Sequence, residues 1–162
     1  MLGQFILAAI VSIGSGYNDL KVRRIPNLIT LPGILSGFIL NTVLSGFNGF
    51  KISLIGFLIG FCFFLVLYLI GGMGAGDVKL MGAIGAIMGY PLIINVFIFT
   101  AISSLIIIIF MFFPIIYGSI KMKDFSTLKS IRKTYIPYGL AISGGTIITI
   151  VLKYLNIFNI HV

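Results

Sequence analysis

Long, uninterrupted apolar runs constrain this chain more than any other feature. Two of them, Ile52–Ile70 and Leu92–Ile116, are long enough to cross a bilayer, which takes about 20 mainly apolar residues. A soluble domain of this size does not carry several such runs. The sequence therefore predicts an all-α, polytopic membrane protein in which residues 1–162 form a single membrane-embedded domain.

The apolar runs predict six transmembrane helices. The fourth is short, because about 12 residues at 1.5 Å each give roughly 18 Å against a hydrocarbon core of about 30 Å. A re-entrant segment that turns back at Gly89-Tyr90-Pro91 would also fit this length, but it would place the cations of Lys121–Lys133 outside the cell. We therefore expect a short fourth helix that thins the membrane locally or is shielded by its neighbours. The six spans are about Leu2–Tyr17, Leu28–Ser45, Ile52–Ile70, Val78–Gly89, Leu92–Tyr117 and Ile136–Leu152.

The lysines and arginines predict the orientation. If the amino terminus lies outside, nine cations fall on the cytoplasmic side and only Lys51 and Lys153 fall outside, as the positive-inside rule expects for a cell-membrane protein. This distribution in short loops between apolar spans also accounts for the net charge of +8 without nucleic-acid binding. The nine cytoplasmic cations are Lys21, Arg23, Arg24, Lys79, Lys121, Lys123, Lys129, Arg132 and Lys133.

Carboxylates are almost excluded from the chain, which has only three acidic residues. Asp19 and Asp77 each lie at the predicted cytoplasmic end of a span, and a charged residue near lipid is costly enough to be a functional candidate. Two carboxyl groups brought close together share one proton. The ionised member can then take a proton from water while the protonated member donates one to a peptide carbonyl. Asp19 and Asp77 are therefore the candidate catalytic pair, and we expect no metal and no cofactor.

Structural roles remain open for these residues. Asp77 could cap a helix, and Asp19 could pair with its basic neighbours in a solvated loop. Lys79 either anchors the topology or tunes the pair electrostatically, and Asp124 resembles an ordinary solvated charge. Cys62, the only cysteine, is expected to be a buried thiol that packs as a small apolar group.

The residues around the two aspartates favour a rigid setting. Gly74 and Gly76 leave room for another backbone beside Asp77, as an extended peptide substrate needs. Pro26 restricts the residue before it and suits the start of a helix, with Asn27 as a polar anchor. A turn of this kind would control the direction of the preceding aspartate.

Two sequence motifs resemble those of the type IV prepilin peptidases. Asp19-Leu20-Lys21-Val22-Arg23-Arg24-Ile25-Pro26-Asn27 is similar to the first-aspartate motif, and Gly74-Ala75-Gly76-Asp77-Val78-Lys79-Leu80-Met81 is similar to the glycine-spaced second motif. The archaeal preflagellin peptidases have a similar arrangement. The resemblance implies that Asp19 and Asp77 are catalytic and that the protein removes a short basic leader from pilin-like or preflagellin-like precursors at the cytoplasmic membrane face. Long family members carry two Cys-x-x-Cys pairs linked to methylation, which this chain lacks, so we expect no methyltransferase activity.

Two other functions fit the same composition. A proton- or cation-coupled transporter could use the aspartates as a relay, although transporter sites usually lie near mid-membrane between repeated halves. A noncatalytic membrane subunit of a secretion system is the second alternative, and it would tolerate Asp19→Asn. For a peptidase, the expected partners are the precursor protein and the lipid bilayer, and the sequence does not determine the oligomeric state.

Overall fold

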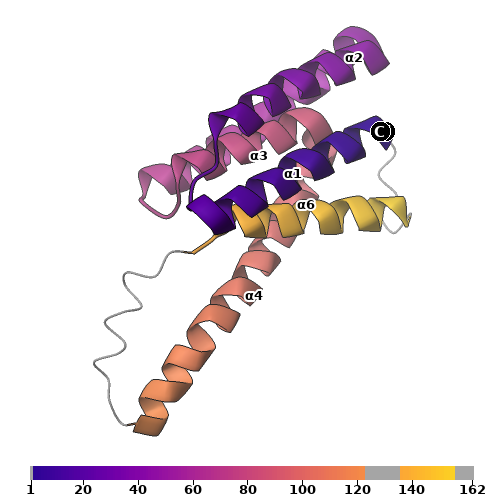
Figure 1. The fold of residues 1–162 in the computed structure, drawn as a ribbon. Helices are drawn as coiled ribbons and strands as arrows, with labels where there is room; N and C mark the ends of the chain where they lie inside the picture. The colour runs from indigo at the N-terminus through magenta and orange to yellow at the C-terminus, as the bar shows by residue number, and fades with distance from the viewer. Residues whose placement is uncertain (1, 123–135, 156–162) are drawn as a thin grey trace.

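The computed structural model of this chain describes residues 2–122 and 136–155, and this part is all-α, as predicted. Residues 123–135, which include Asp124 and most of the predicted basic loop, lie outside the described residues. The helices in Figure 1 are α1 (Leu2–Val22), α2 (Asn27–Leu69), α3 (Ala75–Met88), α4 (Tyr90–Met122) and α6 (Tyr138–Tyr154).

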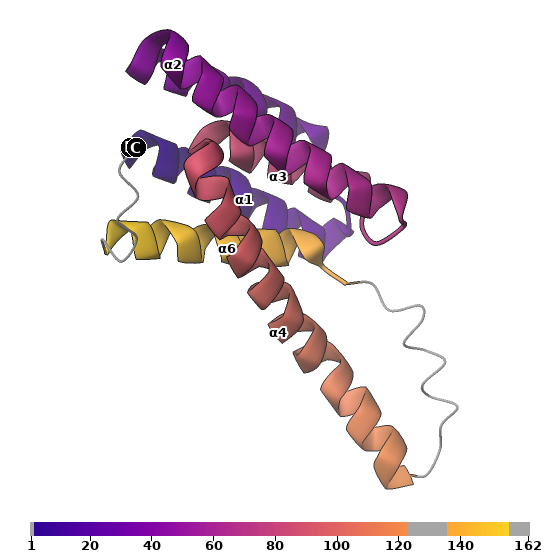
Figure 2. The same ribbon diagram turned by 180° about the vertical axis from the view of Figure 1, so that it is seen from behind.

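Helix α2 consists of two arms that fold back on each other. The backbone leaves helical geometry at Ser45 and Gly46, and Gly46 has a φ of 59°, in the left-handed region that glycine adopts without strain. Phe38 on the first arm and Phe57 on the second lie 6.0 Å apart between ring centroids, and Figures 1 and 2 show the arms side by side. Helical segments therefore occur at all six predicted places. The expected loop between the second and third shrinks to two residues because Gly46 permits a tight turn.

Two helices, α2 and the Tyr90–Pro114 part of α4, are long and apolar enough to cross a membrane, and α6 is a shorter apolar helix. Large apolar side chains lie on the outside of the bundle; Leu28, for example, is 86% exposed and Phe110 is 83% exposed. An apolar surface of this extent suits lipid rather than water, and the protein is a membrane protein. A membrane crossing by all six segments stays a prediction.

The expectation for Cys62 was wrong. Its side chain lies on the second arm of α2 and is exposed on the surface of the described bundle. Because hydrocarbon is as apolar as a protein core, a small apolar side chain in a membrane helix has no need to face inward.

Helix α3 is the central helix, and the two arms of α2 pack against it. Leu80, Ile84 and Ile87 have no exposed surface. The backbones of α2 and α3 approach so closely that a Cβ on Gly85 would lie 2.7 Å from the carbonyl carbon of Gly56. Small residues permit this kind of packing between membrane helices. The short helix is thus shielded by its neighbours, which is one of the two outcomes that the sequence left open.

Asn41 satisfies the carbonyl groups at the end of α3. Its side-chain nitrogen donates to the carbonyl oxygens of Ala86 at 2.9 Å and Ile87 at 3.1 Å, and Ser53 Oγ also donates to Ala86. The Gln4 side-chain nitrogen in turn donates to Asn41 Oδ1. The last carbonyls of a helix have no partner within it, and an unpaired one in an apolar surrounding costs several kcal/mol. Asn41 therefore allows α3 to end inside the bundle.

Helices α4 and α6 complete the bundle. Phe97 of α4 packs on Phe63 of α2, with 4.9 Å between ring centroids. Farther along, α4 crosses α6 where Gly145 lies against Thr100, so closely that a Cβ on Gly145 would be 2.7 Å from Thr100 Cα. Beyond this crossing α4 diverges from the other helices, while α6 lies beside α1 (Figures 1 and 2).

Candidate active site

Asp19 lies in the last turn of α1 rather than in the loop that follows it. The helix continues five residues past the predicted end at Tyr17, to Val22. It stops at Arg23, whose φ of 55° is in the left-handed region. The Asp19 side chain is buried, with 1% of its surface exposed. The alternative that Asp19 is a solvated loop residue is therefore wrong.

The start of α6 holds the Asp19 carboxylate. The backbone N–H of Gly139 donates to Asp19 Oδ2 at 2.8 Å. Gly139 is the second residue of α6, after the N-cap Pro137, and the first backbone N–H groups of a helix have no partner within the helix. They also form the positive end of the helix dipole. A carboxylate is the natural acceptor at this place.

Gly139 leaves no space for a side chain. A Cβ added to it would lie 2.9 Å from both Asp19 Cβ and Asp19 Oδ2, closer than real Cβ contacts. Sequence reasoning missed this residue. The Pro137-Tyr138-Gly139 sequence is compatible with a helix start, but nothing local links it to an aspartate 120 residues earlier.

Asp77 lies in the first turn of α3, just before the apolar stretch that is predicted to span the membrane. Its Oδ2 accepts a hydrogen bond at 3.1 Å from the backbone N–H of Gly74, the N-cap residue. Asp77 is therefore not the N-cap residue itself, but its side chain caps the helix from the third position, and capping was one of the two roles left open. The capping does not exclude the other role, because the same side chain also lines a cavity.

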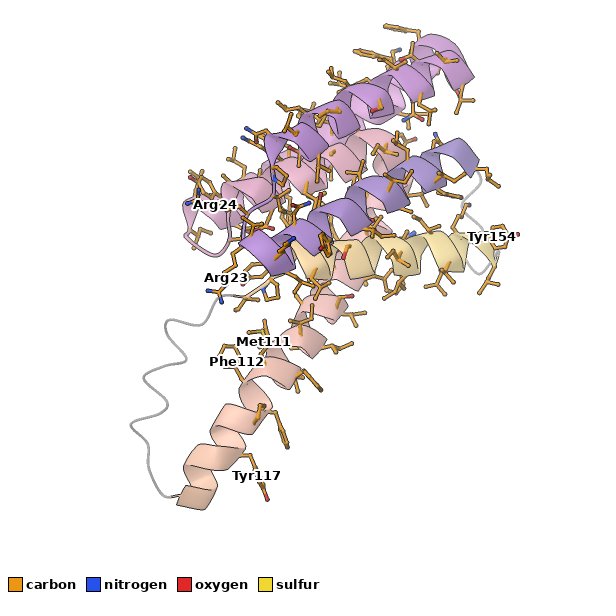
Figure 3. The ribbon with its side chains drawn as sticks, viewed as in Figure 1. Arg23, Arg24, Met111, Phe112, Tyr117 and Tyr154 are labelled. Carbon is orange, nitrogen blue, oxygen red and sulfur yellow. The ribbon has the colours of Figure 1, made fainter. Side chains whose placement is uncertain are left out.

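Both aspartates line one cavity of about 530 Å³. Its walls come from the α1–α2 loop, the segment Gly71–Gly76 and the start of α6. Figure 3 shows the labelled Arg23 and Arg24 at this end of the bundle and Tyr154 at the opposite end. The structure therefore brings together two acidic side chains that are 58 residues apart in the chain.

The surroundings of Asp77 in the cavity change its pKa. Burial raises its pKa from the ordinary 3.8 to about 6, the hydrogen bond from Gly74 opposes this shift, and the nearby charge of Asp19 adds to it. Asp77 consequently keeps its proton at a higher pH than an exposed aspartate does.

The supporting residues of the two motifs contact each other. Lys79 Nζ donates to Asn27 Oδ1 at 3.0 Å and so links the start of α3 to the start of α2. Gly76 faces the loop before α2, where a Cβ on Gly76 would come 3.0 Å from Ile25 Cβ. Pro26 is the N-cap residue of α2, as its predicted place at the helix start suggested.

The described lysines and arginines lie toward opposite ends of the bundle. Arg23 and Arg24 line the cavity of the aspartates. Lys153 lines a different cavity together with Ser45, at the turn between the arms of α2, and Lys51 lies just after that turn. Among the residues that the structure describes, no three His, Cys, Asp or Glu side chains form a group that could hold a metal ion.

Comparison with protein families yields one match. The sequence model of the type IV leader peptidase family matches residues 5–112, two thirds of the chain. The chain belongs to the type IV leader peptidase family. No curated protein and no solved structure gives a significant match. Family membership makes the protein a peptidase, and it supports the prepilin-peptidase resemblance of the two motifs.

The residues that match the family model do not include all the residues that line the cavity. The matched region contains both Asp19 and Asp77, but it ends within α4 and does not include α6. The N–H group that holds Asp19 thus comes from outside the segment by which this leader peptidase is recognised.

Proposed function

We propose that this protein is a membrane aspartic endopeptidase in which Asp19 and Asp77 form the catalytic pair. Its substrates are pilin-like or preflagellin-like precursors, from which it removes the short basic leader. The observation that carries the proposal is the shared cavity: the chain has only three acidic residues, and two of them line it. No metal or cofactor takes part in this mechanism.

The two carboxyl groups have different roles. Asp77 donates the proton, because its raised pKa keeps it protonated longer, and Asp19 accepts one. Asp19 takes a proton from water as the water oxygen bonds to the scissile carbonyl carbon, and Asp77 protonates the carbonyl oxygen. Asp19 then passes its proton to the amide nitrogen, and the C–N bond breaks. Return of a hydroxyl proton to Asp77 leaves a carboxylic acid, an amine and the original state of the pair.

The segment Gly71–Gly76 provides the place for the substrate backbone. Four of its six residues are glycines, so an extended peptide can approach without meeting side chains. Leader peptides are expected to be basic, and the arginines at this cavity do not attract them. Lipid partitioning and backbone contacts therefore dominate substrate binding.

The cavity of the aspartates faces the cytoplasm in this proposal. Arg23, Arg24 and Lys79 lie at its end of the bundle, and the positive-inside rule places such residues on the cytoplasmic side. The amino terminus of α1 then lies outside. Accessibility of single cysteines to an impermeant thiol reagent in intact cells tests this orientation.

Cleavage of a purified pilin precursor in lipid vesicles tests the catalytic pair. Asp19→Asn and Asp77→Asn should each abolish formation of the shortened product while the protein inserts normally. Asp124→Asn is the matched control, because it removes the only other carboxylate side chain of the sequence and should leave cleavage unchanged. Cleavage by either Asp19→Asn or Asp77→Asn would refute the assignment.

A further inference from the structure

A second cavity is also lined by Asp19, but not by the glycine segment. It has a volume of about 450 Å³ and shares only Asp19 and Arg23 with the first cavity. Its other walls are apolar and come from α1, from α6 and from the part of α4 that diverges from the bundle (Figures 1 and 2). They are Leu20, Ile106, Ile107, Phe110, Met111, Pro137 and Leu140.

The apolar space continues along α4. A further cavity of about 440 Å³, between Ile106 and Pro114, shares Ile106 and Phe110 with the second one. We call the two together the α4 groove. Along the helix axis it extends from Ile106 to Pro114, which at 1.5 Å per residue is roughly 12 Å, and its inner end is at Asp19.

We propose that the α4 groove binds the apolar segment of the precursor that follows the scissile bond. This inference rests on the proposed function. The leader side of the bond then lies in the first cavity, beside the glycine segment. The two cavities meet at Asp19, so a peptide that passes from one to the other presents its backbone to the catalytic pair.

The chemistry of the groove favours a peptide over a lipid chain. The inner end of the groove is lined by two charged side chains, Asp19 and Arg23, and polar groups of a bound molecule suit this end better than the hydrocarbon of a lipid tail does. A precursor brings backbone N–H groups to the same place, and after cleavage it brings a new amino terminus. Its apolar segment meanwhile covers Phe110 and Ile106, which are 83% and 61% exposed. A substrate that is polar at one end and apolar at the other matches the two cavities.

Site-specific disulfide crosslinking tests this placement. The parent protein carries Cys62→Ala, which removes the only cysteine, and a second version adds Asp77→Asn to stop turnover. Phe110→Cys is introduced into the turnover-deficient version and mixed in vesicles with a pilin precursor that has one cysteine just after its cleavage site. Leu35→Cys is the matched control, because Leu35 is an apolar residue, 63% exposed, on the first arm of α2 and outside the groove.

We expect a crosslinked product from Phe110→Cys and none above background from Leu35→Cys. Equal crosslinking from both positions would overturn the groove assignment, as would crosslinking of Phe110→Cys only to a second copy of this protein. If the Cys62→Ala parent cleaves the precursor but Phe110→Cys never crosslinks to it, the groove holds lipid and the inference is wrong. If the parent does not cleave at all, the proposed function itself fails.

Kinetic measurements on one variant give a second test of the groove assignment. Ile106→Trp fills the groove without touching the glycine segment, and we expect it to raise KM for the full precursor. Cleavage of a short peptide that ends soon after the scissile bond should stay unchanged, since this peptide has no apolar segment to place. Equal loss for both substrates would mean that the substitution disturbs the catalytic pair instead, and it would count against the inference.

Discussion

Replacement of Gly139 by alanine should impair cleavage through Asp19. The new Cβ would lie 2.9 Å from Asp19 Cβ and Oδ2 and 3.0 Å from Cγ, whereas carbon atoms in contact prefer about 3.5–4.0 Å. Either the carboxylate or the start of α6 must therefore move by about half an ångström to one ångström. A displacement of about 1 Å at reacting groups costs on the order of 100-fold in rate. We expect a loss of this order in kcat, with KM for the precursor nearly unchanged.

The assay compares Gly139→Ala with Gly14→Ala. Gly14 lies on α1, five residues before Asp19, and a Cβ there would meet only Ile29 Cδ1 at an ordinary 3.8 Å. Both variants replace a helical glycine by alanine, so the chemical change is the same at the two positions. Gly14→Ala should cleave the precursor at the rate of the unmodified protein.

Protein stability must be measured alongside the rate. Overpacking of a buried contact costs about 1–3 kcal/mol, so Gly139→Ala should remain folded but melt at a lower temperature. A variant that unfolds would lose both kcat and its helical signal. If Gly139→Ala is folded and cleaves as fast as Gly14→Ala, the Gly139 N–H group does not position Asp19 and the reasoning is refuted.

The titration of Asp77 and the capping of α3 give two more predictions. The infrared carbonyl band of protonated Asp77 should disappear with a midpoint near pH 6, and cleavage should fall as the pH rises through it, because the doubly ionised pair has no proton to donate. Asp19→Asn should lower that midpoint, since it removes the charge that helps to raise it; an unchanged midpoint would show that the carboxyl groups are not coupled. Asn41→Leu should lower the free energy of unfolding by about 1–3 kcal/mol, because it removes the side-chain donor to the carbonyl groups of Ala86 and Ile87, and Ser53 donates only to Ala86. Thr42→Val is its exposed control and should change stability by less than about 0.5 kcal/mol; equal effects would contradict the capping role.

Much of the helical layout was predictable from local patterns. Apolar runs and glycine or proline breaks predicted a helical segment at each observed place, because hydropathy and backbone preferences are properties of neighbouring residues. Helix ends were less accurate, as α1 shows: it continues past Tyr17 because packing against α6 stabilises a polar last turn. Cys62 shows another limit, because in an apolar solvent the side-chain pattern does not distinguish the inner face of a helix from the outer one.

Local sequence patterns were enough to predict an all-α membrane protein, the six helical segments and Asp19 and Asp77 as the candidate pair, since so few carboxylates occur among so many apolar residues. The packing of the helices was needed to show that the start of α6 holds Asp19, that Asn41 terminates α3 and that an apolar groove reaches Asp19. The two hydrogen bonds join groups that are 45 and 120 residues apart. They depend on how the helices pack against one another, which no local pattern of residues encodes.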